Sequence, residues 1–159
     1  MGLDMYLEAR KYVSNYNFEI ERNGENAEYH AIINAIGADK MVTDDVPSVE
    51  VKINVMYWRK ANAIHSWFVQ ELADGRDECQ PIYVERENLV TLLNLCKQVA
   101  LQPANARQAL PTQAGFFFGS TEYDEWYMQD IKRTIEGLER VLEVIPADGR
   151  WSFIYQASW

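Results

Sequence analysis

Three stretches of the chain alternate apolar and polar residues, which is the pattern of a strand with one buried face. They are residues 3–9, 49–55 and 151–159. Helices are predicted over four other stretches, from apolar residues at helical spacing and from the glycines and prolines that end them. They are residues 25–36, 57–71, 87–101 and about 120–145. We also expect a turn at Asn23-Gly24, a short extended piece at 82–84 and a short helix or loop at 104–113.

These elements do not alternate regularly as strand, helix and strand, so they give little support for a doubly wound parallel sheet. The pattern favours an α+β fold, with a small mixed or antiparallel sheet packed against about three main helices. A chain of 159 residues with 48% hydrophobic content can bury one substantial core and is short for two. We therefore expect residues 1–159 to form a single domain.

The predicted helix 57–71, with the sequence YWRKANAIHSWFVQE, carries an unusual polar face. At about 100° per residue, one arc outside the apolar stripe contains an aromatic ring, a guanidinium, an amide, an imidazole and a hydroxyl. These belong to Trp58, Arg59, Asn62, His65 and Ser66. Together they could stack on a small polar ligand and hydrogen-bond to it, and the Arg59 fork suits a phosphate or carboxylate. The structural alternatives are a core Trp58, an internal salt bridge of Arg59 and a hydrogen-bonded, non-catalytic His65.

A second candidate group lies at the predicted start of the long helix, where Ser120 and Thr121 can act as N-caps. Asp124 falls in register with the apolar stripe of this helix, so we expect it on the buried side. As a ligand site, Ser120 and the free N–H groups of the helix would receive an anion, and Tyr123 or Asp124 would contact a hydroxyl. As a purely structural feature, Thr121 and Asp124 resemble a capping box.

The sequence contains no catalytic or metal-binding motif. His30 and His65 are far apart in the chain, and neither HExxH nor a phosphate loop is present. The two cysteines, Cys79 and Cys96, lack the CxxC spacing of a zinc site. We therefore expect no metal and no cofactor, and we favour a protein without enzymatic activity.

Three segments form a recognisable set: MGLDMYL at residues 1–7, YWRKANAIHSWF at 57–68 and LPTQAGFFFGSTEYDEWY at 110–127. Together they resemble a family of small bacteriophage and prophage proteins of unknown function. The resemblance covers roughly a quarter of the chain. It implies a viral or prophage origin, and it implies no biochemical activity.

Charge and hydropathy limit the partners. The formal net charge of -9 makes non-specific binding to nucleic acid unfavourable. The chain has no apolar run long enough for a membrane span and no signal-peptide pattern at its start, so we expect a soluble protein in the cytoplasm of a bacterial host cell. The aromatic strand at 151–159 could cover a sheet edge or pair between subunits, which makes a homodimer an open expectation.

Three functions are compatible with these observations. The first is a phage protein that binds a small polar, nucleotide-derived ligand and so removes a host defence signal, using Arg59 and the helix start at Ser120. The second is an acidic interaction protein that inhibits a host protein, for example as a DNA mimic. The third is a small phosphoesterase or nucleotide-modifying enzyme that uses His65 and Asp124, which requires these two side chains to meet in the fold.

Overall fold

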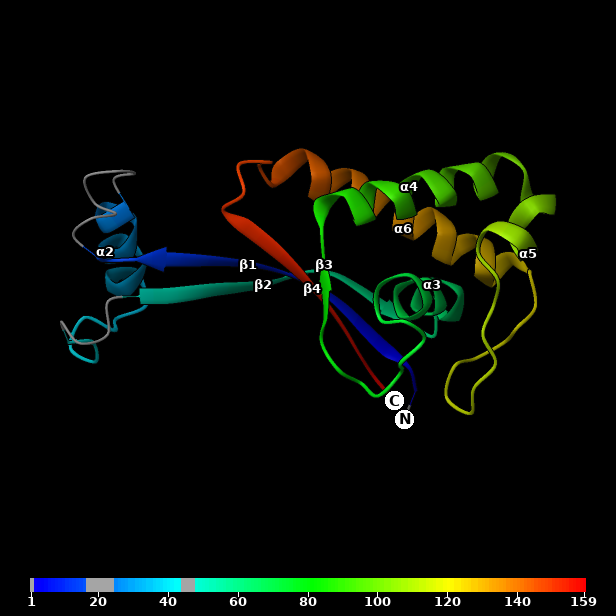
Figure 1. Cartoon of the computed structure of the whole chain (residues 1–159), viewed down its shortest axis with the longest axis horizontal. Helices are drawn as coiled ribbons and strands as arrows, with labels where there is room; N and C mark the ends of the chain where they lie inside the picture. Colours follow the sequence, from blue (N-terminus) through cyan, green and yellow to red (C-terminus); the bar gives the residue numbers. More distant parts are fainter. Residues whose placement is uncertain (1, 17–24, 44–47) are drawn as a thin grey trace. The chain divides into compact units, whose positions relative to one another are not determined.

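The computed structural model describes residues 2–16, 25–43 and 48–159, and Figure 1 shows the order of its elements. The predicted turn at Asn23-Gly24 lies outside the described residues. The strands are β1 (Asp4–Ser14), β2 (Ser48–Arg59), β3 (Ile82–Val84) and β4 (Trp151–Ser158). The helices are α2 (Glu25–Ala35), α3 (Asn62–Leu72), α4 (Arg86–Leu101), α5 (Ala106–Ala109) and α6 (Glu125–Val144), with a 3-10 turn η1 (Pro103–Asn105) before α5.

The expected mixture of helices and strands is confirmed. The four strands form one antiparallel sheet in the order β2-β1-β4-β3. In the pairing of β3 with β4, Tyr83 lies opposite Ile154. Strand β4 lies between β1 and β3, and β3 pairs with its residues Phe153–Tyr155. Pairing of the C-terminal strand between subunits stays a prediction.

Contacts divide the described chain into two units. The larger unit contains residues 1–9 and 53–159, and the smaller one contains residues 10–52. The smaller unit has its own apolar cluster, formed by Val13, Tyr29 and Ile33. The single domain over residues 1–159 stays a prediction.

The core of the larger unit joins the inward faces of the strands to α3, α4 and α6. The predicted apolar face is confirmed, because Leu3, just before β1, and Met5, Leu7 and Ala9 on it are all fully buried. The polar face is not uniformly exposed, since Glu8 is buried as well. Aromatic rings join the sheet to α3, where the Phe68 ring stacks on Tyr155 of β4 with centroids 3.9 Å apart. The packing of the sheet against about three helices, as a description of the fold, stays a prediction.

The predicted helix 57–71 begins too early. Strand β2 continues to Arg59, and α3 starts only at Asn62. Between them Lys60 has a φ of 58°, a left-handed conformation that a residue with a side chain rarely adopts. The prediction of a polar face shared by these side chains on one helix is therefore wrong. Trp58 and Arg59 lie on a strand and point to opposite sides of it.

The start of the long helix was also predicted wrongly. Helix α6 begins at Glu125, and its N-cap is Asp124 rather than Ser120 or Thr121. The Asp124 carboxylate accepts the backbone N–H groups of Trp126 and Tyr127 at 2.9 and 3.1 Å. Asp124 is consequently exposed and does not belong to the buried stripe.

One buried hydrogen bond ties the end of β2 to the middle of α6. The Trp58 indole, which is fully buried, donates from Nε1 to the Thr134 hydroxyl at 2.9 Å. That hydroxyl in turn donates to the carbonyl of Asp130 at 2.7 Å. A donor buried in this way is costly to leave without an acceptor.

Replacing Thr134 by Val keeps the shape of the side chain and removes the acceptor of the Trp58 indole. We expect the free energy of unfolding in urea to fall by about 1–3 kcal/mol. Thr91→Val is the matched control, because the exposed Thr91 hydroxyl also donates to a helix carbonyl, that of Glu87. Equal losses in the two variants would contradict the assigned role of the buried bond.

Candidate functional site

A cavity of about 360 Å³ lies where the end of β2 and the start of α3 face the first turns of α6. One wall is formed by the residues from Arg59 to Ile64. The opposite wall contains Asp124, Trp126 and Asp130, and the loop at Gly119 and Ser120 completes the lining. All of these residues belong to the larger unit.

The start of α3 reaches the cavity without a side-chain cap. The N–H groups of Asn62 and His65 bond to the carbonyls of Lys60 and Ala61. Among the described residues, the N–H groups of Ala63 and Ile64 have no recorded acceptor, as expected for the first turn of a helix. Because the positive end of the helix dipole lies at the same place, this wall favours a negative group.

Two cationic side chains, Arg59 and Lys60, stand at this wall, and both residues are exposed. Two glycines leave room for Lys60. A Cβ on Gly2 would lie 3.2 Å from Lys60 Cε, and a Cβ on Gly119 would lie 3.2 Å from Lys60 Cβ. Gly119 also has a φ of +87°, which favours glycine for a second reason. Gly119 therefore suits the tight turn for two reasons, whereas at Gly2 the neighbouring atom is the flexible end of the lysine side chain.

The α6 wall supplies acids and one large aromatic ring. The Trp126 side chain is 72% exposed although it lines the cavity. Burial raises the pKa of the Asp130 carboxyl to about 6, and nearby Arg133 opposes this shift. The cavity therefore has a cationic side, an acidic side and a ring available for stacking.

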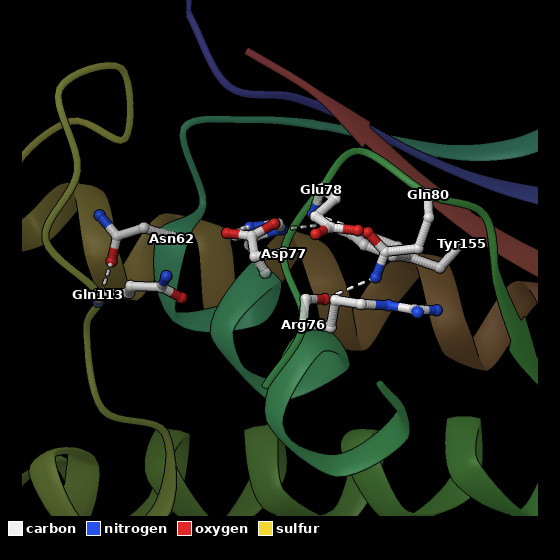
Figure 2. Close-up of polar contacts among 8 residues, drawn as sticks. Asn62, Arg76, Asp77, Glu78, Gln80, Gln113 and Tyr155 are labelled. Atoms are coloured by element: carbon white, nitrogen blue, oxygen red, sulfur yellow. Dashed lines mark hydrogen bonds and ion pairs between the residues drawn. The ribbon is translucent and has the colours of Figure 1, made fainter. Parts of the chain in front are cut away.

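Asn62 holds the loop that closes the cavity. Its Nδ2 donates to the carbonyls of Phe118 and Ser120 at 3.0 and 2.8 Å. Its Oδ1 accepts the N–H of Gln113 at 3.1 Å, a contact drawn in Figure 2. Since the amide has these three partners, we assign Asn62 to positioning the loop 113–120 against the start of α3.

His65 belongs to a buried array of side chains and is absent from the cavity lining. Its ring is 1% exposed, with Nδ1 2.7 Å from the Tyr155 hydroxyl and Nε2 3.1 Å from an Asp77 carboxylate oxygen. Asp77 and Tyr155, the two partners of the ring, are labelled in Figure 2. Burial lowers the pKa of His65, and the hydrogen bond and charge of Asp77 oppose that shift. A neutral ring that donates to Asp77 and accepts from Tyr155 satisfies both of its nitrogens.

The seven residues predicted for the site separate into two groups. Arg59, Asn62, Ser120 and Asp124 line the cavity. Trp58, His65 and Tyr123 are absent from its lining. Trp58 and His65 are buried, and the Tyr123 hydroxyl accepts the N–H of Thr112 at 3.2 Å. The enzyme hypothesis requires His65 and Asp124 to act together. Asp124 lines the cavity, whereas His65 is buried and absent from the lining.

The lining residues that sequence reasoning missed include Lys60, Trp126 and Asp130. Lys60 adjoins Arg59 in the segment already singled out, but its backbone conformation has no signal in the sequence. Trp126 and Asp130 follow the Tyr123–Asp124 pair by a few positions, and their side of α6 becomes clear only when the true start of the helix is known. The described part of the chain contains no group of three or more His, Cys, Asp or Glu residues arranged to hold a metal.

The buried His65 should make the protein sensitive to acid. Its folded-state pKa lies below the ordinary 6.5, so below that pH the unfolded chain takes up a proton that the native state resists. We expect the stability advantage of the wild type over His65→Gln, measured by denaturant unfolding, to shrink as the pH falls from about 7 to about 5. Asp130 changes the free energy of unfolding in the opposite direction, because its raised pKa favours the native state in acid. Both proteins contain Asp130, so its effect cancels in the difference between them.

His30→Gln is the matched control for this measurement, since it makes the same change at an exposed histidine. A stability difference between wild type and His65→Gln that stayed constant with pH would contradict the buried neutral imidazole.

Comparison with known protein families, curated proteins and solved structures gives no guide to the function of this cavity. No family model, no curated protein and no solved structure matches the chain. None of the helices in the described ranges is long and apolar enough to cross a membrane.

Proposed function

We propose that this chain binds a small anionic ligand of the nucleotide class in the cavity at the start of α3, and that it holds the ligand without converting it. The observation that carries the proposal is the uncapped first turn of α3, which opens into the cavity beside Arg59 and Lys60. A phosphate group offers several acceptor oxygens and a negative charge, which match free N–H groups, a guanidinium and an ammonium.

The other side of the cavity favours more than a bare phosphate. Trp126 presents a ring on which a base can stack. The Asp124 carboxylate can accept hydrogen bonds from sugar hydroxyls or from an exocyclic amine. Negative charge on Asp124 and Asp130 would repel a phosphate group placed beside them. A volume of about 360 Å³ lies within the range of small-molecule sites. These features together support a ligand with one anionic end and one aromatic, hydrogen-bonding end.

The placement of His65 supports binding without turnover. A general base must reach the proton that it removes. His65 is buried against Tyr155 and Asp77 and is absent from the cavity lining, so it cannot act on a ligand held there. Combined with the resemblance to phage proteins, this supports a protein that withdraws a host signalling nucleotide by capture. Native mass spectrometry of protein purified from bacteria tests the proposal, because a retained and unaltered nucleotide supports capture and a converted one contradicts it.

Arg59→Ala should weaken binding of a cyclic mononucleotide, cyclic AMP, by about tenfold or more in isothermal titration calorimetry. The reason is the loss of a charge-assisted contact worth about 1.5–3 kcal/mol. Arg76→Ala is the matched control, since Arg76 is an exposed arginine outside the cavity lining. Equal affinities of wild type and Arg59→Ala, or no binding by any member of a panel of cyclic and linear nucleotides, would contradict the proposal.

Binding of the same probe should strengthen as the pH falls from about 7 to about 5. Asp130, with a pKa of about 6, loses its negative charge over this range, whereas the phosphodiester of cyclic AMP keeps a constant charge. In Asp130→Asn the affinity should be almost independent of pH. A wild-type affinity that fell on acidification would show that the ionised Asp130 contributes to binding, contrary to this assignment.

A further inference from the structure

Strand β2 is an edge of the sheet, with β1 as its neighbour. The backbone N–H of Lys60 donates to the carbonyl of Leu3 at 2.8 Å, so this N–H faces β1. By the alternation of an antiparallel strand, the backbone hydrogen-bonding groups of Tyr57, Val55 and Ile53 face away from β1. The Arg140 guanidinium confirms this direction, because it donates to the outward carbonyl of Val55 at 3.3 Å. Among the described residues, no other strand pairs with the outward-facing backbone groups of residues 53–59, and Arg140 is the one side chain seen to bond to them.

The outer side of α6 next to this edge has a self-complementary order of charges. Arg133, Glu136, Arg140 and Glu143 are all exposed. If two α6 helices lie antiparallel about Leu138, Glu136 of one copy meets Arg140 of the other, and Arg133 meets Glu143. Four pairs of opposite charge form in this way, and no like charges are brought together among these positions. Such an arrangement selects a partner and fixes its register.

The edge of β2 is self-complementary about Val55. Antiparallel pairing of two β2 strands about this residue places Val55 opposite its own copy and Tyr57 opposite Ile53. The side chains of Ile53 and Tyr57 are 46% and 36% exposed, on the face of the strand opposite to the buried Met56. Aromatic pairs with β-branched residues across two strands are favourable. The pairing would therefore cover two exposed apolar side chains on each copy.

The charge pattern of α6 is centred on Leu138, and the pairing of β2 is centred on Val55. These two centres lie close together, because Arg140 of α6 contacts Val55 of β2. A groove of about 350 Å³, lined by residues 54–57 of β2 and by Arg133, Glu136, Gly137 and Arg140, runs between the edge and the helix. We infer that a second copy of this chain docks here, with β2 pairing to β2 and α6 lying beside α6. The Val55 carbonyl can accept both Arg140 and the partner strand, since it has two lone pairs.

The charge pattern gives the test, which uses the full chain and sedimentation velocity over a wide range of concentration. Wild type should form a dimer. Glu136→Arg should raise the dimer dissociation constant by about tenfold or more, because Arg then meets Arg, and Arg140→Glu should do the same because Glu meets Glu. An equimolar mixture of the two variants should dimerise again, since each variant then supplies the charge that the other lacks. Glu78→Arg is the control, as it makes the same charge change on an exposed residue outside the groove.

A backbone variant tests the strand pairing separately. The N–H of Val55 faces away from β1, so Val55→Pro removes a donor to the partner strand while leaving the bonds to β1 in place. It should be monomeric with an unchanged circular dichroism spectrum. A wild type that is monomeric at every concentration, variants that remain dimeric, or a mixture that fails to dimerise would each overturn the inference. None of these results depends on the ligand cavity.

Discussion

The backbone turn at Lys60 is the constraint on which the candidate site depends. With a φ of 58°, this residue ends β2 and allows α3 to begin two residues later. A left-handed conformation at a residue with a side chain costs free energy, of the order of 1 kcal/mol, and persists only where the surroundings hold it. Here the Lys60 N–H bonds to Leu3, its carbonyl accepts the N–H of Asn62, and Gly2 and Gly119 leave space for its side chain.

Around this turn, neighbouring residues have different roles, because some are buried in the core and others line the cavity. Trp58, the last inward residue of β2, is buried and bonds to Thr134. Arg59 and Lys60 face the cavity, and the next turn of chain offers the free N–H groups of Ala63 and Ile64. Asn62 then fixes the loop 113–120 over this start through three hydrogen bonds. A short segment thus connects the core, the cavity and the loop that closes it.

Much of the secondary structure was predictable because it follows from the periodicity of apolar residues. The apolar face of β1, the stripe of α4 and the ending of α2 before Gly37 agree with the structure to within a few residues. The strand-to-helix junction was not predictable, because periodicity gives no sign of a left-handed lysine and the apolar spacing of 57–71 fits a helix. Asp124 was misplaced for a related reason: its spacing matches the buried stripe, but capping at the N-terminus overrides that register.

The site was predicted only in part, for physical reasons of the same kind. Arg59, Asn62, Ser120 and Asp124 were selected for their chemistry, and all four line one cavity. His65 was selected too, but its partners Asp77 and Tyr155 lie 12 and 90 positions away in the chain, and no local pattern indicates that they meet. Whether Trp126 and Asp130 line the cavity depends on the rotation of α6 about its axis. That rotation is set by packing against β2 and α4.

The proposed function requires the first turn of α3 to receive the anionic group of a ligand. Amide chemical shifts in ¹H–¹⁵N spectra, recorded while cyclic AMP is added, test it most directly. We expect the signals of Ala63 and Ile64 to move most, together with those around Ser120, because their N–H groups gain an acceptor. If these signals stayed in place while the ligand bound elsewhere, or if no nucleotide of the panel moved them, binding of an anion at the first turn of α3 would be contradicted.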